Sequence, residues 1–153
     1  MEKGRVLSVN ISESRGEKKR NVGSCRAVEG AGLEGDGHYG FMHRQISLLS
    51  LESIETMRKL GLDVGPGDFA ENLTVEGLDL KKLKVGDMIR IGKNVLLRIS
   101  QIGKECHERC AIYFQAGDCV MPREGIFAEV LVGGEIRAGD EVEILSDDSF
   151  MEN

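Results

Sequence analysis

The 153-residue chain has no tryptophan, only two prolines and no long hydrophobic run. Its longest apolar stretches, such as residues 95–97 and 126–128, fall far short of the ~18 residues that a membrane-spanning helix needs. Residues 1–5 lead into a strand-like segment without the apolar region of an export signal. We therefore expect a cytoplasmic protein that does not associate with membranes.

Basic residues are fewer than acidic residues. The chain has 20 Lys and Arg against 26 Asp and Glu, which gives a formal net charge of −6. Binding to nucleic acids or anionic membranes normally needs a broad basic face, so we expect neither partner, although a small cationic pocket is compatible with this balance. Cysteines number only four, and in a reducing compartment they act as thiols, nucleophiles or metal ligands rather than as disulfides.

Glycine, in contrast, is abundant: its 20 residues indicate many tight turns. Alternating apolar residues predict several short strands: at 6–11, at 45–49, after 69–74 with an end near residue 75, at 95–102, and after a turn within each of 83–91 and 136–144. One helix is expected over residues 51–60, capped by Ser50 and ended by Gly61. This pattern predicts a single mainly β domain over residues 1–146, a β-barrel or sandwich with one or two peripheral helices. Residues 147–153 are expected to form an acidic C-terminal tail.

Two segments are expected to be loops. Residues 12–20, SESRGEKKR, are almost purely polar and predict a solvated hairpin loop. Residues 30–40 contain five glycines, which no helix or central strand tolerates, so we expect a structured loop that visits positive φ. Its spacing fits neither GxGxxG nor GK[ST], which excludes these nucleotide fingerprints. The loop ends in a polar cluster of His38 and His43 beside Asp36 and Arg44, and its free amides could hold an anion.

Three cysteines, Cys106, Cys110 and Cys119, lie within fourteen residues. Cys106 and Cys110 share one face in either a strand or a helix. Neighbouring cationic groups favour the thiolate form of a cysteine, and here they are Lys104, His107 and Arg109. Three interpretations stay open: a reactive or sulfur-carrying Cys106, a metal site formed by the three cysteines, and buried structural thiols.

Several motifs in fixed order resemble those of the MOSC domain, the C-terminal domain of molybdenum cofactor sulfurases. The match covers roughly residues 4–145, and its motifs are GDGHYG at 35–40, RQISLLS at 44–50, GDFAENLT at 67–74, Cys106 and GGEIRAGD at 133–140. Glu105 stands where the family commonly has a proline. The resemblance implies a barrel-like fold, similar to the pyruvate-kinase barrel domain, and a role in molybdenum-cofactor chemistry.

The same resemblance implies that the protein binds molybdopterin, or molybdenum, and that Cys106 carries sulfur as a persulfide. No pyridoxal-phosphate domain fits in this chain, so the sulfur donor would be a separate cysteine desulfurase and the recipient the cofactor or a molybdoenzyme. Whether the protein is an enzyme, a sulfur carrier or transferase, stays open. The alternatives are a module that binds and presents the cofactor without covalent chemistry, and a zinc-stabilised binding domain.

The candidate site residues follow from this hypothesis. Cys106 would accept the sulfur and Cys110 or Cys119 would resolve it as a disulfide. His38 and His107 are the candidates for proton transfer. The remaining candidates contact the cofactor, largely through its phosphate, and are Arg44, Lys104, Arg123 and Asn72.

Overall fold

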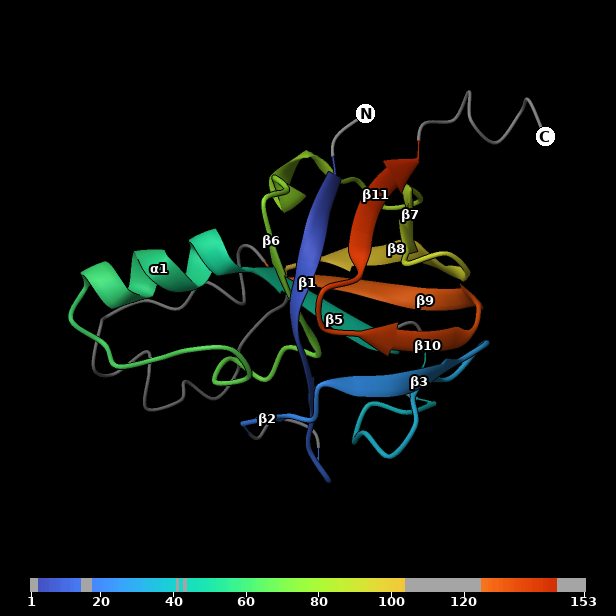
Figure 1. Cartoon of the computed structure of the whole chain (residues 1–153), viewed down its shortest axis with the longest axis horizontal. Coiled ribbons are helices and arrows are strands. Elements are labelled where there is room, and N and C mark those ends of the chain that lie inside the picture. The colour runs from blue at the N-terminus through green and yellow to red at the C-terminus, as the bar shows by residue number, and fades with distance from the viewer. Residues whose placement is uncertain (1–2, 15–17, 41, 43, 104–124, 146–153) are drawn as a thin grey trace.

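The computed structural model describes residues 3–14, 18–40, 42, 44–103 and 125–145, and Figure 1 shows how their strands and single α-helix are arranged. The elements are β1 (Lys3–Ile11), β2 (Arg20–Asn21), β3 (Ser24–Val28), β4 (Gly32–Leu33), β5 (Ile46–Ser50), α1 (Leu51–Lys59), β6 (Leu73–Glu76), the 3₁₀ turn η1 (Leu80–Lys82), β7 (Met88–Ile91), β8 (Val95–Ile102), β9 (Ile126–Val132), β10 (Gly134–Arg137) and β11 (Glu141–Leu145). None of the helices among them is long and apolar enough to cross a membrane.

Seven strands close into a barrel in the order β1–β11–β7–β8–β9–β5–β6, with β6 returning to β1. Six of the seven contacts are antiparallel and only β5–β6 is parallel. A closed ring with an odd number of strands cannot alternate in direction throughout, so it needs such a parallel pair. Parallel neighbours require a long crossover connection, and α1 with the loop after it supplies one. The predicted mainly β, barrel-like fold is confirmed.

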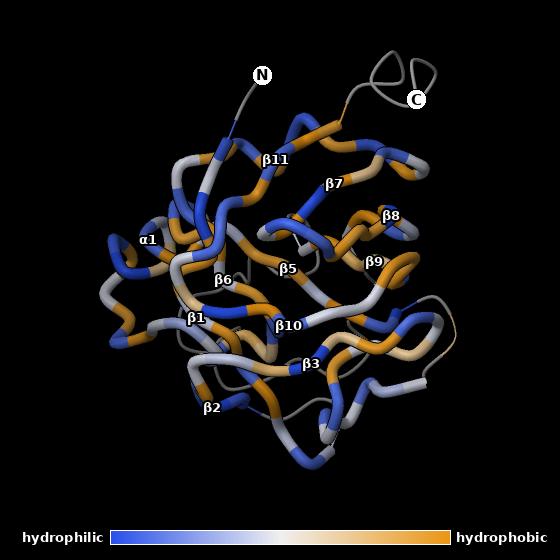
Figure 2. The backbone as a smooth tube through the Cα atoms, turned by 45° about the vertical axis from the view of Figure 1, so that its right-hand side comes forward, coloured by the Kyte–Doolittle hydropathy of each residue, from blue (hydrophilic) through white to orange (hydrophobic). Residues whose placement is uncertain are grey.

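Two apolar clusters lie on opposite sides of the barrel wall, and Figure 2 shows the hydrophobic stretches of the strands in orange. The larger cluster fills the barrel and includes Val9, Leu48, Leu73, Leu97, Ile126 and Ala128. The smaller cluster packs α1 against the outside of the wall and consists of Leu49, Ile54, Met57, Val64, Phe69 and Phe127. Because side chains alternate along a strand, Leu49 and Phe127 point outward from β5 and β9. The outer face of these strands is therefore covered by other parts of the chain.

The predicted helix is confirmed to within a residue. The Ser53 amide donates to Ser50 Oγ over 3.1 Å, which caps α1, and Gly61 adopts a φ of +94° after its last turn. Strands β1, β5, β7, β8 and β11 also lie where the alternating pattern predicts them. Strands β3, β9 and β10 are not foreseen; β9 lacks a clear alternation because its consecutive residues Ile126, Phe127 and Ala128 are all buried, so both of its faces are covered there.

The glycine-rich loop is confirmed. Gly30, Gly32, Gly35 and Gly40 have positive φ values of +70°, +127°, +83° and +76°. A side chain at Gly32 would also collide with the carbonyl of Gln45, so this position needs glycine for space as well as for its backbone conformation.

Candidate functional site

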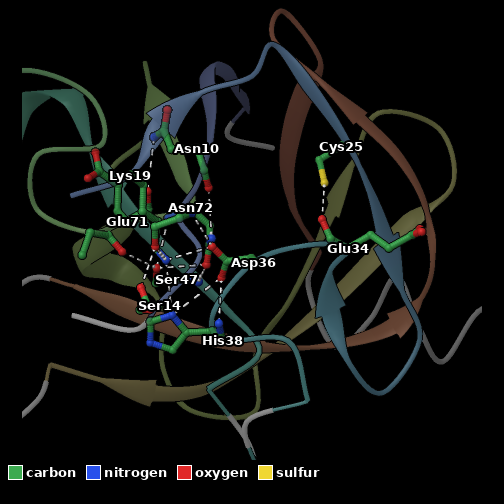
Figure 3. A network of polar contacts seen from close by, with 12 residues as sticks. Asn10, Ser14, Lys19, Cys25, Glu34, Asp36, His38, Ser47, Glu71 and Asn72 are labelled. Carbon is green, nitrogen blue, oxygen red and sulfur yellow. Dashed lines mark hydrogen bonds and ion pairs between the residues drawn. The ribbon is translucent and has the colours of Figure 1, made fainter. Parts of the chain in front are cut away.

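Lys19 is completely buried, contrary to the prediction that residues 12–20 form a solvated loop. Its ammonium nitrogen donates to Ser12 Oγ and to Asp36 Oδ1, each over 2.9 Å. The side chains of Lys19 and Asp36 have no exposed surface, and Figure 3 shows the pair within a wider polar network. The prediction is wrong for Ser12 and Lys19 because the Lys19 amide donates to the Gly67 carbonyl, which fixes the segment against the 65–70 loop and turns its ammonium inward.

Asp36 is held as a carboxylate by three hydrogen-bond donors. The amides of Ser12 and His38 donate to its two oxygens over 3.0 Å each, in addition to the Lys19 contact. Burial alone would raise the pKa of Asp36, but the interactions with His38 and Lys19 and the two backbone hydrogen bonds outweigh it and hold the pKa well below its usual range. The pair therefore joins the 12–20 segment to the glycine loop as two opposite charges.

His38 packs on this ion pair. Its Nδ1 lies 3.4 Å from Lys19 Nζ and 3.7 Å from Asp36 Oδ2, and its side chain is 13% exposed. The structure thus brings His38 and Asp36 together, as their place in one glycine-rich loop suggests. The second histidine of the predicted cluster, His43, lies outside the described residues. No contact between His38 and Arg44 is found in the described part of the chain.

Asn72 ties three parts of the fold together from a fully buried position. Its Nδ2 donates to the Asn10 carbonyl over 3.1 Å, and its Oδ1 accepts from the amide and the hydroxyl of Ser47 at 2.9 and 3.2 Å. Both side-chain polar atoms are therefore engaged in joining β1, β5 and the start of β6. The predicted contact of Asn72 with a cofactor stays a prediction.

Glu71, beside Asn72, is a buried carboxyl that the sequence analysis does not single out. Thr74 Oγ1 donates to its Oε2 over 2.7 Å, whereas its Oε1 has no hydrogen-bond partner among the residues that the structure describes. Burial raises the pKa of Glu71 by more than its hydrogen bonds, chiefly those from the Gly67 amide and Thr74, lower it. Burial therefore disfavours the charged form of Glu71. The only sequence signal is its place in the ENLT motif.

Arg44 lies beside the ends of the connection between β8 and β9. Its Nε donates to Gln101 Oε1 over 3.0 Å, and its guanidinium carbon lies 5.2 Å from the centre of the Phe127 ring. Gln101 Nε2 in turn donates to the Gly103 carbonyl over 2.7 Å, and the Gly103 amide donates to the carbonyl of Gly125 over the same distance. The two ends of the connection are thus joined next to Arg44.

The connection itself, residues 104–124, lies outside the described residues. It contains most of the predicted site, namely Lys104, Cys106, His107, Cys110, Cys119 and Arg123, so these assignments and the alternative metal site of Cys106, Cys110 and Cys119 stay predictions. Within the residues that are described, no group of three or more His, Cys, Asp or Glu side chains is placed to hold a metal ion.

Cys25 is the one cysteine in the described ranges, and it is a free, half-buried thiol. Its Sγ donates to the Glu34 carbonyl over 3.3 Å. Burial raises the pKa of Cys25, and the nearby carboxylates of Glu135, Glu34 and Asp36 add to the effect. Since the thiolate is the nucleophile, Cys25 is poorly suited to sulfur chemistry.

The guanidinium of Arg44 is a candidate anion-binding group. It is half-buried, oriented by Gln101 and supported by the ring of Phe127. The described residues provide no ion-pair partner for it and no hydrogen bond to its terminal nitrogens. An arginine fork that is held in place but not neutralised is suited to bind a phosphate or carboxylate in a bidentate manner.

Comparisons with known proteins agree with this architecture. A family model described as the MOSC domain matches residues 34–143. The YUAD protein from Bacillus subtilis is 21% identical, with 93% of this chain and 95% of that chain covered and a TM-score of 0.79. YiiM from Geobacillus stearothermophilus is 19% identical, with 94% of this chain and 75% of that chain covered, and has a TM-score of 0.68. YiiM from Escherichia coli is 23% identical, with 93% of this chain and 70% of that chain covered, and has a TM-score of 0.62. At such identities the likeness shows the fold. A search of curated proteins finds no match.

Proposed function

Because the chain belongs to the MOSC domain family, we propose that it binds the molybdenum cofactor, or the pterin part of it, and handles sulfur through Cys106. The family name is that of the C-terminal domain of molybdenum cofactor sulfurases, and the matched range, 34–143, contains both Arg44 and Cys106. The cofactor supplies, when bound, a phosphate for recognition and a molybdenum centre that accepts sulfur.

The observation that carries the proposal is the position of Arg44. Its guanidinium is oriented by Gln101 and Phe127 and has no ion-pair partner among the described residues, so it fits a phosphate. Gln101 is bonded to Gly103, at the point where the chain enters the 104–124 connection. Cys106 is three residues further along, and three residues span at most about 11 Å. A phosphate on Arg44 is therefore close to the segment that carries the cysteine, and Lys104 and Arg123, near the ends of that segment, are further phosphate ligands in this proposal.

The sulfur transfer proposed for Cys106 needs no external oxidant. The Cys106 thiolate attacks the outer sulfur of a cysteine persulfide on a separate desulfurase. A new S–S bond forms on Cys106, and the donor's S–S bond breaks with release of the donor thiolate. Attack by Cys110 or Cys119 on Cys106 then forms a disulfide and releases hydrosulfide to the acceptor. His107 is the candidate for the proton transfers.

Mass spectrometry of the intact protein tests this proposal. After incubation with a cysteine desulfurase and free cysteine, and an acid quench before Cys110 or Cys119 resolves the persulfide, wild-type protein should show one added sulfur atom on Cys106, and Cys106→Ser should not. Cys25→Ser is the matched control and should gain sulfur like the wild type, since Cys25 is half-buried and hydrogen-bonded to a carbonyl. If Cys106→Ser accepts sulfur as well as the wild type, the carrier role is wrong.

A second measurement separates sulfur transfer from simple cofactor presentation. If the protein only binds and presents the cofactor, Cys106→Ala should bind pterin with unchanged affinity and the wild type should take up no sulfur. If the cysteines hold zinc, elemental analysis should find about one metal per chain, and a chelator should lower the melting temperature.

A further inference from the structure

Gln101 contacts Arg44 through a side-chain amide that is engaged at both ends. Its Oε1 accepts from Arg44 Nε over 3.0 Å, and its Nε2 donates to the Gly103 carbonyl over 2.7 Å. A guanidinium can only donate and a carbonyl can only accept, so these partners fix which end of the amide faces Arg44. The Phe127 ring, 5.2 Å from the guanidinium carbon, is the other contact. Arg44 is thus held by two uncharged side chains.

A shift of register in β8 places Gln101 on the outer face of the barrel. Leu97 and Ile99 belong to the cluster that fills the barrel. Since side chains alternate along a regular strand, Gln101 would also point inward. Between Ile99 and Gln101, however, the pairing with β9 shifts by one residue, and Gln101 pairs with Phe127, which lies in the outer cluster. Such a bulge re-aims a side chain, and here it turns the amide toward the face on which Arg44 lies.

The neutrality of this amide leaves the positive charge of Arg44 available. A carboxylate in the same place would bind the guanidinium as an ion pair and so oppose the binding of another anion. An amide oxygen accepts the Nε–H without cancelling the charge. Arg98 on β8, in contrast, lies 3.6 Å from a carboxylate oxygen of Glu129. Arg44 has no such carboxylate partner within the ranges that the structure describes.

We propose that Gln101 is a positioning residue that determines the specificity of this site: it orients the Arg44 guanidinium and, as a neutral amide, leaves its charge for a phosphate group. That this phosphate belongs to a pterin rests on the function proposed above, whereas the orientation of Arg44 does not. The bond from Gln101 to the Gly103 carbonyl also gives this residue a structural role. The experiment therefore has to separate the two roles.

Nuclear magnetic resonance tests the orientation of Arg44 without any ligand. In ¹⁵N-labelled wild-type protein, the Arg44 Nε–H signal, assigned from its loss in Arg44→Lys, should exchange with water more slowly than that of Arg98, whose side chain is 46% exposed. Gln101→Met removes the amide and should speed the exchange at Arg44 about fivefold, as expected for one lost hydrogen bond. The exchange at Arg98 should not change. If the two wild-type signals exchange equally fast, the proposal is wrong even where Gln101→Met fails to fold.

Titration with inorganic phosphate, followed through the Arg44 signals, tests the role of charge. Gln101→Met should bind phosphate about fivefold more weakly than the wild type, because the guanidinium is no longer held. Gln101→Glu should bind phosphate still more weakly, because the new carboxylate neutralises the guanidinium. Both variants lose the amide bond to Gly103, so a purely structural role for Gln101 predicts equal losses.

Equal phosphate affinities of the two variants, or wild-type affinity in either, would overturn the proposal. So would a wild type whose Arg44 signals do not respond to phosphate. Calorimetry with a phosphate-bearing pterin separates this result from the proposed function. If the wild type responds to phosphate but does not bind the pterin, the proposed function fails and the role of Gln101 stands. If wild type and Gln101 variants bind the pterin equally well, the role of Gln101 is wrong and the proposed function stands.

Discussion

Lys19 Nζ and Asp36 Oδ1 lie 2.9 Å apart, and neither side chain has any surface exposed to solvent. The pair joins the 12–20 segment to the glycine-rich loop, and His38 packs on it. Charges buried in this way are costly unless each finds its partner. This side of the barrel is therefore expected to be stable when both charges are present or when both are replaced, and to be destabilised when one charge is left buried without its partner.

Replacing only one member of the pair should be strongly destabilising. Lys19→Met leaves the Asp36 carboxylate buried without its cation, and we expect a loss of about 3–5 kcal/mol in the free energy of unfolding. Urea denaturation followed by circular dichroism measures this. Lys18→Met is the matched control and should change stability by less than about 0.5 kcal/mol. The double variant Lys19→Met/Asp36→Leu should lose less than the sum of the two single variants; additive losses would contradict the pairing.

The Asp36 carboxyl should make the protein sensitive to acid. Its pKa in the folded state lies below the ordinary value of 3.8, so the folded protein binds fewer protons here than the unfolded chain. The stability contribution of Asp36 is therefore complete above its unfolded pKa and is lost as the pH falls below about 4 toward the folded pKa. Urea midpoints measured between neutral pH and pH 3 should fall in the wild type. In Asp36→Asn they should start lower and fall less.

Glu71 should have the opposite pH dependence. Its pKa is raised above the ordinary value of 4.5 by burial, so the folded protein retains a proton that the unfolded chain loses. The stability contribution is complete below the unfolded pKa and is lost as the pH rises through the folded pKa. Glu71→Gln, a neutral side chain of the same shape, should remove this decline. If stability measured from pH 4.5 upward changes identically in both proteins, Glu71 is not protonated in the native state.

The elements with a clear sequence period could be predicted, and the buried polar groups could not. Helix α1 has a cap residue, a turn-spaced apolar face and a terminal glycine, and β1 and β8 alternate, so local physics determines them. Lys18 and Lys19 are identical neighbours, yet one is exposed and the other buried. Only the distant partners Asp36 and Gly67 distinguish them, and no local pattern contains that information.

The same reasoning applies to the candidate site residues. His38 lies within the glycine-rich loop and Arg44 follows it, which makes both candidates from the sequence, and both have defined environments in the structure. A glutamate on a short segment is normally exposed, so no local pattern indicates that Glu71 is buried; its burial depends on distant contacts, such as that of Asn10 Nδ2 with the Glu71 carbonyl. Cys106 stood out by composition, and its role stays a prediction.

Gly67 should tolerate alanine poorly. Its φ is +90°, and an added Cβ would collide with the carbonyl of Lys19, whose amide bonds to the Gly67 carbonyl. Gly61 is the matched control, because it has a similar φ of +94° and open space around its Cα. Gly61→Ala should lower the free energy of unfolding only by the backbone strain, about 1–2 kcal/mol. Gly67→Ala should lower it clearly more. If the two variants lose the same stability in thermal or urea unfolding, the contact of Gly67 with the 12–20 segment contributes little to the stability of the fold.

Arg44 should decide the affinity for a phosphate-bearing pterin without being essential to the fold. Arg44→Met keeps an apolar stem near Phe127 but removes the guanidinium. Since a hydrogen bond to a charged group is worth about 1.5–3 kcal/mol, binding should weaken about 10- to 150-fold. Arg44→Lys keeps the charge without the planar guanidinium, and its binding affinity should fall between those of Arg44→Met and the wild type.

Arg98 provides the control, because it is a partly exposed arginine on β8 that already pairs with Glu129 at 3.6 Å. Titration calorimetry should find unchanged affinity for Arg98→Met. If Arg44→Met binds as tightly as Arg98→Met while both remain folded, the phosphate is held elsewhere, and the proposal loses the contact on which it chiefly depends.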